Sequence, residues 1–292
     1  MFWFLMGISV FGYALQTTLM ARHVRALDPL SVGFYRNLTL GISMAPLLFF
    51  VPREAWLAIP QFWIEITVAA LLAAFSQWTR FLSQRALPVG ISSAAVNGFN
   101  VFLAFLFSGF YFAEWLSLGQ VLLVVVIVSG SLALSIGRSP QMRHLENVQW
   151  WQGLGLIVLR SVSLTAAFTL ITKISRDFNP LLTGYLWEIL IAVCSIFILG
   201  GRWLFTGEKL VKVSFLQFWT ILRDASPTAL GTAGFLLAVT MAPFALASGV
   251  SVMSIVFTTL FCAWCYHEKL YFWQYLVIGI TVLAVMVLRL LS

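Results

Sequence analysis

Residues 18–34 read TLMARHVRALDPLSVGF, and residues 169–185 read TLITKISRDFNPLLTGY. The two stretches align without a gap, and both place a proline after an aspartate or asparagine and a glycine before an aromatic residue. The similarity continues downstream, where FAEWLSLGQ (112–120) parallels YHEKLYFWQ (266–274) and pairs Glu114 with Glu268. The chain is therefore predicted to contain two copies of one structural unit.

The composition around these stretches is that of a membrane protein. Of the 292 residues, 61% are hydrophobic and 9% are charged, whereas about a quarter of a soluble domain is charged. Apolar runs of about 20 residues follow one another, and each can cross a hydrocarbon core of about 30 Å. The formal charge of +7 comes from basic residues scattered singly between these runs, a pattern typical of loops that orient membrane helices. The sequence predicts an all-α, multi-pass membrane protein that does not bind nucleic acid.

Ten transmembrane helices are predicted from these apolar runs, and prolines such as Pro29, Pro180 and Pro243 mark the start of several. The predicted spans are residues 2–21, 30–51, 62–86, 89–110, 115–136, 152–174, 181–204, 225–242, 244–265 and 270–291. They divide into a first five-helix repeat (1–137), a linker (138–149) and a second five-helix repeat (150–292). Because five is an odd number, the second copy enters the membrane upside down, which predicts two inverted repeats.

The distribution of basic residues predicts the orientation of the chain. Most loop arginines and lysines, including Arg22, Arg85, Lys212 and Arg223, fall on the side opposite the N-terminus. Cytoplasmic loops carry an excess of such residues, so this count predicts that both termini are external.

The ordered set of these motifs resembles the drug/metabolite transporter superfamily, in its ten-helix exporter branch. The likeness rests on the pattern D/N-P-x-x-x-G-F/Y at Asp28–Phe34 and Asn179–Tyr185, on Arg36, and on the acidic residue before the fifth and tenth spans. The resemblance implies an exporter of small metabolites in a bacterial inner membrane, similar to an aromatic amino-acid exporter. It also implies termini in the cytoplasm, which disagrees with the charge count.

Polar residues inside a bilayer are costly, so each one is a candidate site residue. The fourth span carries Asn97 and Asn100 on one helical face, and the ninth carries Ser251 and Ser254 at matching repeat positions. These stripes predict two helices that face a hydrated cavity across the repeat. The alternative is that the small residues only allow close helix packing.

Two other spans supply further candidates for substrate binding. The third span carries Gln77, Trp78 and Arg80, and an arginine there can bind a carboxylate through two parallel hydrogen bonds. The alternative for Arg80 is that its long side chain reaches the membrane interface. In the first span, Tyr13 and Gln16 lie on one side and are candidates for the wall of the same pocket.

Glu188 is the acidic residue of greatest interest, and it is equivalent to Asn37 in the first copy. Burial penalises the charged form of a carboxyl group, so Glu188 is predicted to bind substrate and to carry a proton that couples transport. Asn37 is a candidate binding residue at the matching position. The alternative for Glu188 is a structural ion pair with Arg160 or another buried cation.

Two classes of function follow from the sequence. The first is a secondary transporter of small organic metabolites such as amino acids, which works by alternating access between the two repeats. The second is a membrane-embedded enzyme that acts on a lipid or lipid-linked substrate, and it would require clustered acids, histidines or metal ligands. The sequence shows no such cluster, no H-E-x-x-H and no phosphate-binding loop, and the isolated pair Cys262 and Cys265 is explained as small buried residues. We therefore expect a transporter without catalytic residues, cofactor or metal.

Overall fold

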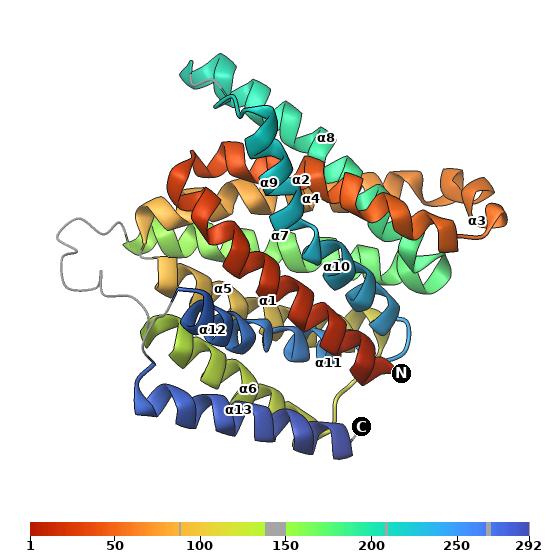
Figure 1. Ribbon diagram of the computed structural model, residues 1–292. Coiled ribbons are helices and arrows are strands. Elements are labelled where there is room, and N and C mark those ends of the chain that lie inside the picture. Colours follow the sequence, from red (N-terminus) through yellow and green to blue (C-terminus); the bar gives the residue numbers. More distant parts are fainter. Residues whose placement is uncertain (88, 138–149, 208–209, 267–269, 292) are drawn as a thin grey trace.

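The computed structural model describes residues 1–87, 89–137, 150–207, 210–266 and 270–291, which fold predominantly into helices (Figure 1). In chain order these are α1 (Phe2–Ala26), α2 (Pro29–Met44), the 3₁₀ helix η1 (Ala45–Phe50), α3 (Arg53–Leu57), α4 (Ile59–Ala86), α5 (Val89–Phe112), α6 (Leu118–Gly137), α7 (Trp150–Asp177), α8 (Pro180–Thr206), α9 (Phe215–Ala225), α10 (Pro227–Ala238), α11 (Phe244–Ser251), α12 (Ser254–Cys265) and α13 (Phe272–Leu290). The predicted linker 138–149 and Glu268 lie outside the described residues.

These helices form ten membrane-crossing segments, because α9–α10 and α11–α12 are each one interrupted rod. Seven segments in the described part of the chain are long and apolar enough to cross a membrane by length and composition alone, and α6 adds a shorter apolar helix. The other two are α2, which has only 16 residues, and α9–α10, which is broken at Ser226–Pro227. The chain is an all-α polytopic membrane protein.

Both chain ends emerge on the same side of the helix bundle, as an even number of crossings requires (Figure 1). We call this side the terminal side and the other the opposite side. The helices α1, α4, α6, α8 and α12 end on the opposite side, where α2, α5, α7, α9 and α13 begin (Figure 1).

The repeated motif forms the start of the second helix in each copy. The Asp28 carboxylate accepts a hydrogen bond from the backbone N–H of Ser31 at 3.1 Å, and a proline occupies the first turn of α2. In α8, Asn179 Oδ1 accepts hydrogen bonds from the backbone N–H groups of Leu181 and Leu182, both at 3.0 Å. Both caps satisfy backbone donors that the first helical turn leaves free, and they allow a tight turn after the preceding helix.

Equivalent helices of the two copies run antiparallel. Asn37 of α2 contacts Ser195 of α8 at 3.1 Å, whereas Asp28, earlier in α2, contacts Arg202, later in α8, at 3.4 Å. The last helices behave in the same way, since Gln120 at the start of α6 lies 3.5 Å from the carbonyl of Leu291 beyond α13. Two parallel copies would place equivalent helices parallel, so this packing is that of an inverted pair.

The packing between the copies is reciprocal. α4 of the first copy packs along α7, the first helix of the second copy, while α10 packs along α1. Small residues make the α4 contact possible, because Ala69, Ala70, Ala73 and Ala74 are all buried. The α1–α10 contact is closer still, since a Cβ atom built on Gly12 would lie 2.5 Å from the carbonyl oxygen of Pro227. Such small-residue contacts are the usual means of helix association in membranes.

The structure corrects the prediction for the eighth span. The sequence predicts a polar linker at Gly200–Ser214 and a helix at 225–242, but α8 continues to Thr206 and α9 begins at Phe215. The signal for α9 is a capping box, in which Ser214 and Gln217 bond each other's backbone N–H at 3.2 and 2.9 Å. The ninth span is also divided, into α11 and α12, rather than continuous.

Candidate functional site

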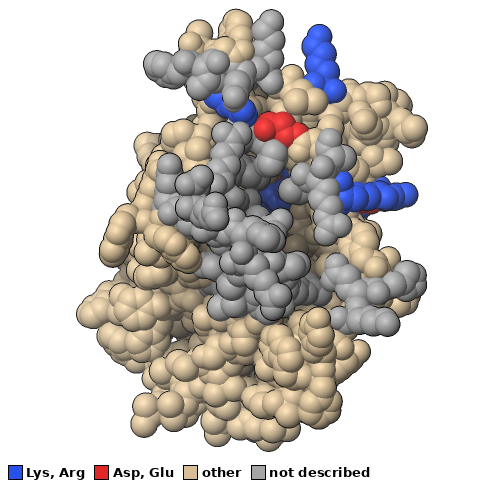
Figure 2. All heavy atoms as spheres, turned by 90° about the vertical axis from the view of Figure 1, so that its left-hand side faces the viewer, with Lys and Arg blue, Asp and Glu red and all other residues tan. Residues whose placement is uncertain are grey.

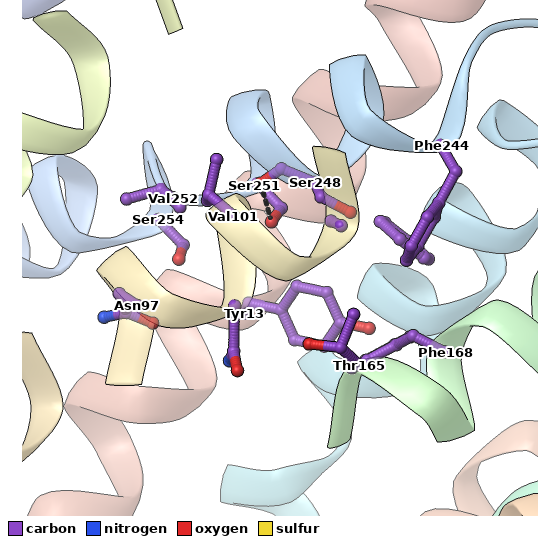
Figure 3. A pocket seen from close by; sticks show the side chains of 13 residues that line it. Tyr13, Asn97, Val101, Thr165, Phe168, Phe244, Ser248, Ser251, Val252 and Ser254 are labelled. Carbon is purple, nitrogen blue, oxygen red and sulfur yellow. Dashed lines mark hydrogen bonds between the residues drawn. The ribbon is translucent and has the colours of Figure 1, made fainter. Parts of the chain in front are cut away.

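A cavity of about 140 Å³ lies between helices of both copies (Figure 3). Its wall is formed by α1, α5, α7, α10 and α11–α12, through the residues Tyr13, Asn97, Asn100, Val101, Ala104, Thr165, Phe168, Phe235, Phe244, Ser248, Ser251, Val252 and Ser254. Five of the predicted binding residues are among them: Tyr13, Asn97, Asn100, Ser251 and Ser254. We call this space the central cavity.

The lining of the central cavity is amphipathic. Aromatic rings from Tyr13, Phe168 and Phe244 form one part, and the amides of Asn97 and Asn100 form another. The Oδ1 of Asn100 and the Oγ1 of Thr165 are buried and have no hydrogen-bond partner within the described residues. A buried polar atom without a partner costs free energy, so these atoms are suited to a polar group of a bound molecule or to water.

The helix interruption between α11 and α12 borders the central cavity at Ser251, Val252 and Ser254. Two backbone bonds there span only three residues, from Met253 N to Val250 O and from Ile255 N to Val252 O, each at 3.0 Å. This tighter 3₁₀ geometry within a helical rod is common at hinges. The equivalent helix of the first copy, α5, is continuous, so the two walls differ in how readily they bend.

Glu188 reaches the central cavity through a chain of hydrogen bonds. The Thr232 hydroxyl donates to Glu188 Oε1 at 3.3 Å, and the Tyr13 hydroxyl lies 3.2 Å from the same Thr232 oxygen. A threonine hydroxyl has a single proton, so when Thr232 donates to Glu188, Tyr13 is the donor to Thr232. Tyr13 lines the cavity, and thus a buried carboxyl group is connected to the cavity through two hydroxyl groups.

The basic residue that acts electrostatically on Glu188 is Arg36, a partly buried cation other than Arg160. The two groups act on each other electrostatically, yet no ion pair within 4 Å joins Glu188 to a basic residue in the described part of the chain. Arg36 instead donates a hydrogen bond to Asn37 Oδ1 at 3.0 Å. Asn37 in turn donates to Ser195 at 3.1 Å, so the hydrogen bonds from Arg36 reach α8 of the second copy.

The remaining predicted residues lie outside the central cavity. Asn37, Gln77 and Trp78 line a separate recess of about 30 Å³ between α2, α4 and α8. Gln16 is buried, with 7% of its surface exposed, but lines neither space. Arg80 is partly buried, and its Nε atom has no hydrogen-bond partner within the described residues. The predicted residues are therefore distributed over two spaces and their surroundings.

A polar cluster bounds the central cavity on the terminal side. Arg176, near the end of α7, pairs with Glu114 at 2.9 Å and donates to the carbonyls of Val239 and Ala242 at 2.8 and 3.0 Å. The backbone N–H of Phe244 donates to Glu114 at 3.2 Å, and the Phe244 ring lines the cavity. These bonds connect α5, α7 and the loop between α10 and α11, and we call them the terminal-side seal.

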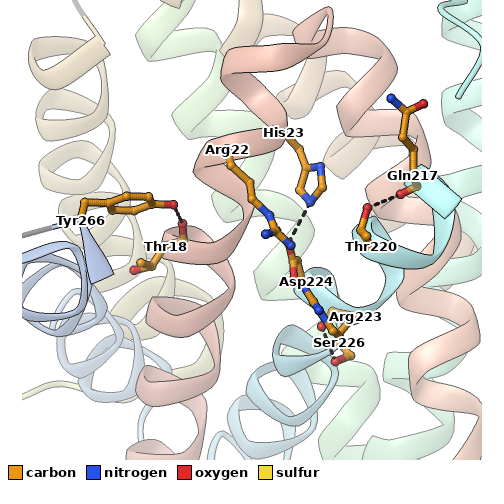
Figure 4. A network of polar contacts seen from close by, with 9 residues as sticks. All are labelled: Thr18, Arg22, His23, Gln217, Thr220, Arg223, Asp224, Ser226 and Tyr266. Atoms are coloured by element: carbon orange, nitrogen blue, oxygen red, sulfur yellow. Dashed lines mark hydrogen bonds and ion pairs between the residues drawn. The ribbon is translucent and has the colours of Figure 1, made fainter. Parts of the chain in front are cut away.

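A second charged cluster joins α1 to α9 near the opposite side (Figure 4). The Asp224 side chain is 1% exposed and accepts hydrogen bonds from Arg22 and His23, each at 2.8 Å. Arg223 donates to its other oxygen at 3.1 Å. This cluster fixes the end of α1 against the break between α9 and α10.

Sequence reasoning missed Thr165, Phe168 and Ser248 in the cavity wall and Thr232 in the hydrogen-bond chain. A signal was present for Thr165. α7 carries hydroxyl side chains at Ser161, Thr165, Thr169 and Thr172, at helical spacing, and all of them are buried. No sequence signal distinguishes Phe168 among the 26 phenylalanines of the chain.

Comparison with known proteins finds a family match for the N-terminal part of the chain. Residues 1–136 match the model of the EamA-like transporter family. This family belongs to the drug/metabolite transporter superfamily and consists of secondary transporters, so the resemblance drawn from the motifs is confirmed at that level for residues 1–136.

The fold extends over the whole chain. A solved crystal structure superposes on 100% of this chain and 98% of its own, with a TM-score of 0.77 and 13% sequence identity, and 27 chains of solved structures match in all. At this identity the likeness concerns the fold alone. No curated protein matches at the same stringency.

Proposed function

We propose that this EamA-like chain is a secondary transporter of small organic metabolites, amino acids among them, that works by alternating access. Its two moving parts are the five-helix units 1–137 and 150–292. The proposal rests on one observation, the central cavity, whose walls come from equivalent helices of the two units, α5 and α11–α12. Substrate sites at the interface of inverted repeats are the usual arrangement in such transporters.

The terminal-side seal is the part that must open during transport. Release on the terminal side requires Arg176 and Glu114 to separate and Phe244 to leave the cavity wall. The 3₁₀ step at Val250–Met253 is the hinge about which α11 can turn away from α12. An inverted repeat makes this exchange mechanically simple, since each unit can take up the arrangement of the other.

The solute is recognised by the amides of Asn97 and Asn100 and by the hydroxyls of Ser251 and Ser254, while aromatic rings hold its apolar part. The cavity volume of about 140 Å³ is below the roughly 300–1,000 Å³ of sites for drug-sized ligands. This size favours a small metabolite over a bulky one.

Glu188 carries the proton that couples transport. Glu188 is 5% exposed, and its carboxyl group connects to the cavity through Thr232 and Tyr13, so binding of a solute beside Tyr13 changes the hydrogen-bond chain that ends at the carboxyl. The direction of transport is outward across a bacterial inner membrane. The excess of basic residues places the opposite side in the cytoplasm.

Counterflow in proteoliposomes tests the proposal. Vesicles loaded with one unlabelled amino acid, amine, nucleoside or sugar are assayed for uptake of its labelled form, first with the parent protein. Asn97→Leu and Asn100→Leu should reduce counterflow of every accepted solute at least tenfold, because each removes a polar group from the cavity and fills part of it. Phe99→Leu is the matched control, since Phe99 lies on the same helix and is 40% exposed. Equal activity of all three variants would exclude the cavity as the transport path.

The coupling role of Glu188 requires a separate assay. Glu188→Gln keeps the size of the side chain but cannot release a proton, so it should abolish the pH dependence of net uptake while counterflow persists. An unchanged pH profile in this variant would show that Glu188 does not carry the coupled proton.

A further inference from the structure

Three arginines inside the helix bundle have no carboxylate partner. Arg36 lies on α2, Arg80 on α4 and Arg160 on α7, and none of them forms an ion pair within the described residues. Their side chains are near enough to act on one another, Arg36 on Arg80 and Arg80 on Arg160. Three like charges in a membrane interior are costly unless something compensates them.

Pairing is the rule for the other interior arginines. Arg176 pairs with Glu114 at 2.9 Å and Arg202 with Asp28 at 3.4 Å, and their side chains are 21% and 16% exposed. The protein therefore supplies a carboxylate partner to each of these two arginines. Among the described residues, the buried carboxyl group of Glu188 acts electrostatically on Arg36.

Arg80 and Arg160 also have buried N–H donors without a partner among the described residues. Arg80 Nε, Arg160 Nε and Arg160 Nη1 are inaccessible to solvent and have no hydrogen-bond partner in the described part of the chain. Leaving such a donor unsatisfied costs about 1–3 kcal/mol, and more when the group is charged. A guanidinium group presents its donors as a planar fork that matches the oxygens of a carboxylate or phosphate. The missing partner is therefore an oxyanion.

Arg80 and Arg160 lie at the same depth in the bundle. The antiparallel helices α4 and α7 bring Leu87 beside Gly153 at the opposite side. Arg80 precedes Leu87 by seven residues, and Arg160 follows Gly153 by seven. With a rise of 1.5 Å per residue, both lie about 10 Å deeper than that contact. The space-filling view of the opposite side shows Lys and Arg side chains in the upper half of this face (Figure 2).

The arginines also connect to the central cavity. Ser161 and Thr165 follow Arg160 along α7, and both hydroxyl groups are buried without a partner among the described residues. Thr165 lines the cavity. A line of unsatisfied polar groups thus leads along α7 from the arginines to the cavity.

We propose that Arg80 and Arg160 bind the anionic group of the transported solute, which is therefore an organic acid with a net negative charge rather than a zwitterion. The inference rests on the proposed transport function and narrows its substrate class. Arg36, Arg80 and Arg160 together with an ionised Glu188 leave two positive charges, which an anion of charge −1 or −2 reduces or cancels. The carboxylate or phosphate lies between the two guanidinium groups, and the apolar part of the solute extends toward Phe168.

Binding to matched probes tests the inference. The purified full-length protein is titrated with 3-phenylpropionate, phenylalanine and phenethylamine, which share one ring and differ in charge, and with phenyl phosphate. Propionate, alanine and ethylamine form an aliphatic series for a smaller site. We expect the anions to raise the unfolding temperature and the amines to leave it unchanged. Stabilisation by phenyl phosphate alone would identify the group as phosphate.

Substitutions of the two arginines test whether the anion binds at Arg80 and Arg160. Arg80→Gln and Arg160→Gln should weaken anion binding about 10- to 100-fold, the loss expected for charge-assisted hydrogen bonds. Arg160→Lys keeps the positive charge but lacks the planar guanidinium group, so its anion affinity should lie between those of the parent and Arg160→Gln. The control is Arg53→Gln, since Arg53 is exposed near the terminal side. Because Arg160 is uncompensated, Arg160→Gln should unfold at a higher temperature than the parent without ligand, whereas a structural arginine would lower it.

The outcomes separate this inference from the proposed function. Equal stabilisation by anion and zwitterion, unchanged anion binding in both glutamine variants, or no stabilisation by any anion would each overturn the anion site. Counterflow of zwitterions could still proceed in that case, and the transport function would stand. Anion binding without counterflow of any probe would retain the site and contradict transport.

Discussion

The contact between α1 and α10 gives the sharpest test of how the fold supports the site. A Cβ atom on Gly12 would lie 2.5 Å from the carbonyl oxygen of Pro227 and 2.9 Å from the nitrogen of Gly231. Both are backbone atoms of α10, so no side-chain rotation can relieve the overlap. Gly12→Ala therefore forces the helices apart by about 0.9 Å, the difference between 2.5 Å and an ordinary contact of 3.4 Å.

This separation has two consequences. Overpacking of this kind costs about 1–3 kcal/mol of stability. The displacement also moves Tyr13, the next residue on α1, away from Thr232 on α10, and their hydrogen bond of 3.2 Å would lengthen to about 4 Å. Gly12→Ala should therefore lower both the unfolding temperature and the rate of proton-coupled uptake.

Gly7→Ala is the matched control, since it makes the same change on the same helix and no atom lies within 4 Å of the added Cβ. It should leave transport unchanged and raise stability by up to about 1 kcal/mol, because alanine loses less backbone freedom on folding than glycine. Both variants are compared by thermal unfolding in detergent and by uptake in proteoliposomes. Indistinguishable unfolding and uptake of the two variants would refute the close backbone contact between α1 and α10.

Three further variants test individual interactions. Tyr13→Phe removes the hydroxyl bonded to Thr232, at a cost of about 0.5–1.5 kcal/mol, and should slow coupled uptake without unfolding the protein; normal uptake would exclude the hydroxyl chain as the proton route. Glu114→Gln weakens the bond to Arg176, so hydrogen exchange in α11 should accelerate, and unchanged protection would show that the seal does not hold α11. Asp224→Asn should lower stability by about 1–3 kcal/mol in thermal unfolding, because it weakens three hydrogen bonds at a buried group, whereas parent-like unfolding would show that these bonds contribute little.

Most of the fold could be predicted from the sequence because membrane helices are recognisable by their length and apolar composition. The D/N-P caps located the starts of α2 and α8, and the repeat with its odd number of helices predicted the antiparallel pairs that the structure shows. The prediction from the sequence was wrong where helices are interrupted. Nothing in the residues near Val252 and Met253 marks the 3₁₀ step, because that step depends on packing against other helices.

Part of the lining of the central cavity was predicted from the sequence. Asn97, Asn100, Ser251 and Ser254 line the central cavity because polar residues at helical spacing must face away from lipid. Helical spacing predicts which residues share one face of a helix, but it does not predict which other helices pack against that face. The partners of Glu188 and the isolation of Arg160 therefore became visible only when α2, α7, α8 and α10 were placed together.

The reciprocal packing of α4 on α7 and α10 on α1 has a consequence for biogenesis. A ribosome delivers the five helices of the first unit to the membrane before their main docking surfaces exist, so Ala70 and Gly12 face lipid until the second unit arrives. Nascent chains arrested after the first unit should be unstable and sensitive to membrane proteases. Two separately synthesised halves, by contrast, should assemble into one functional carrier when they are present in the same cell.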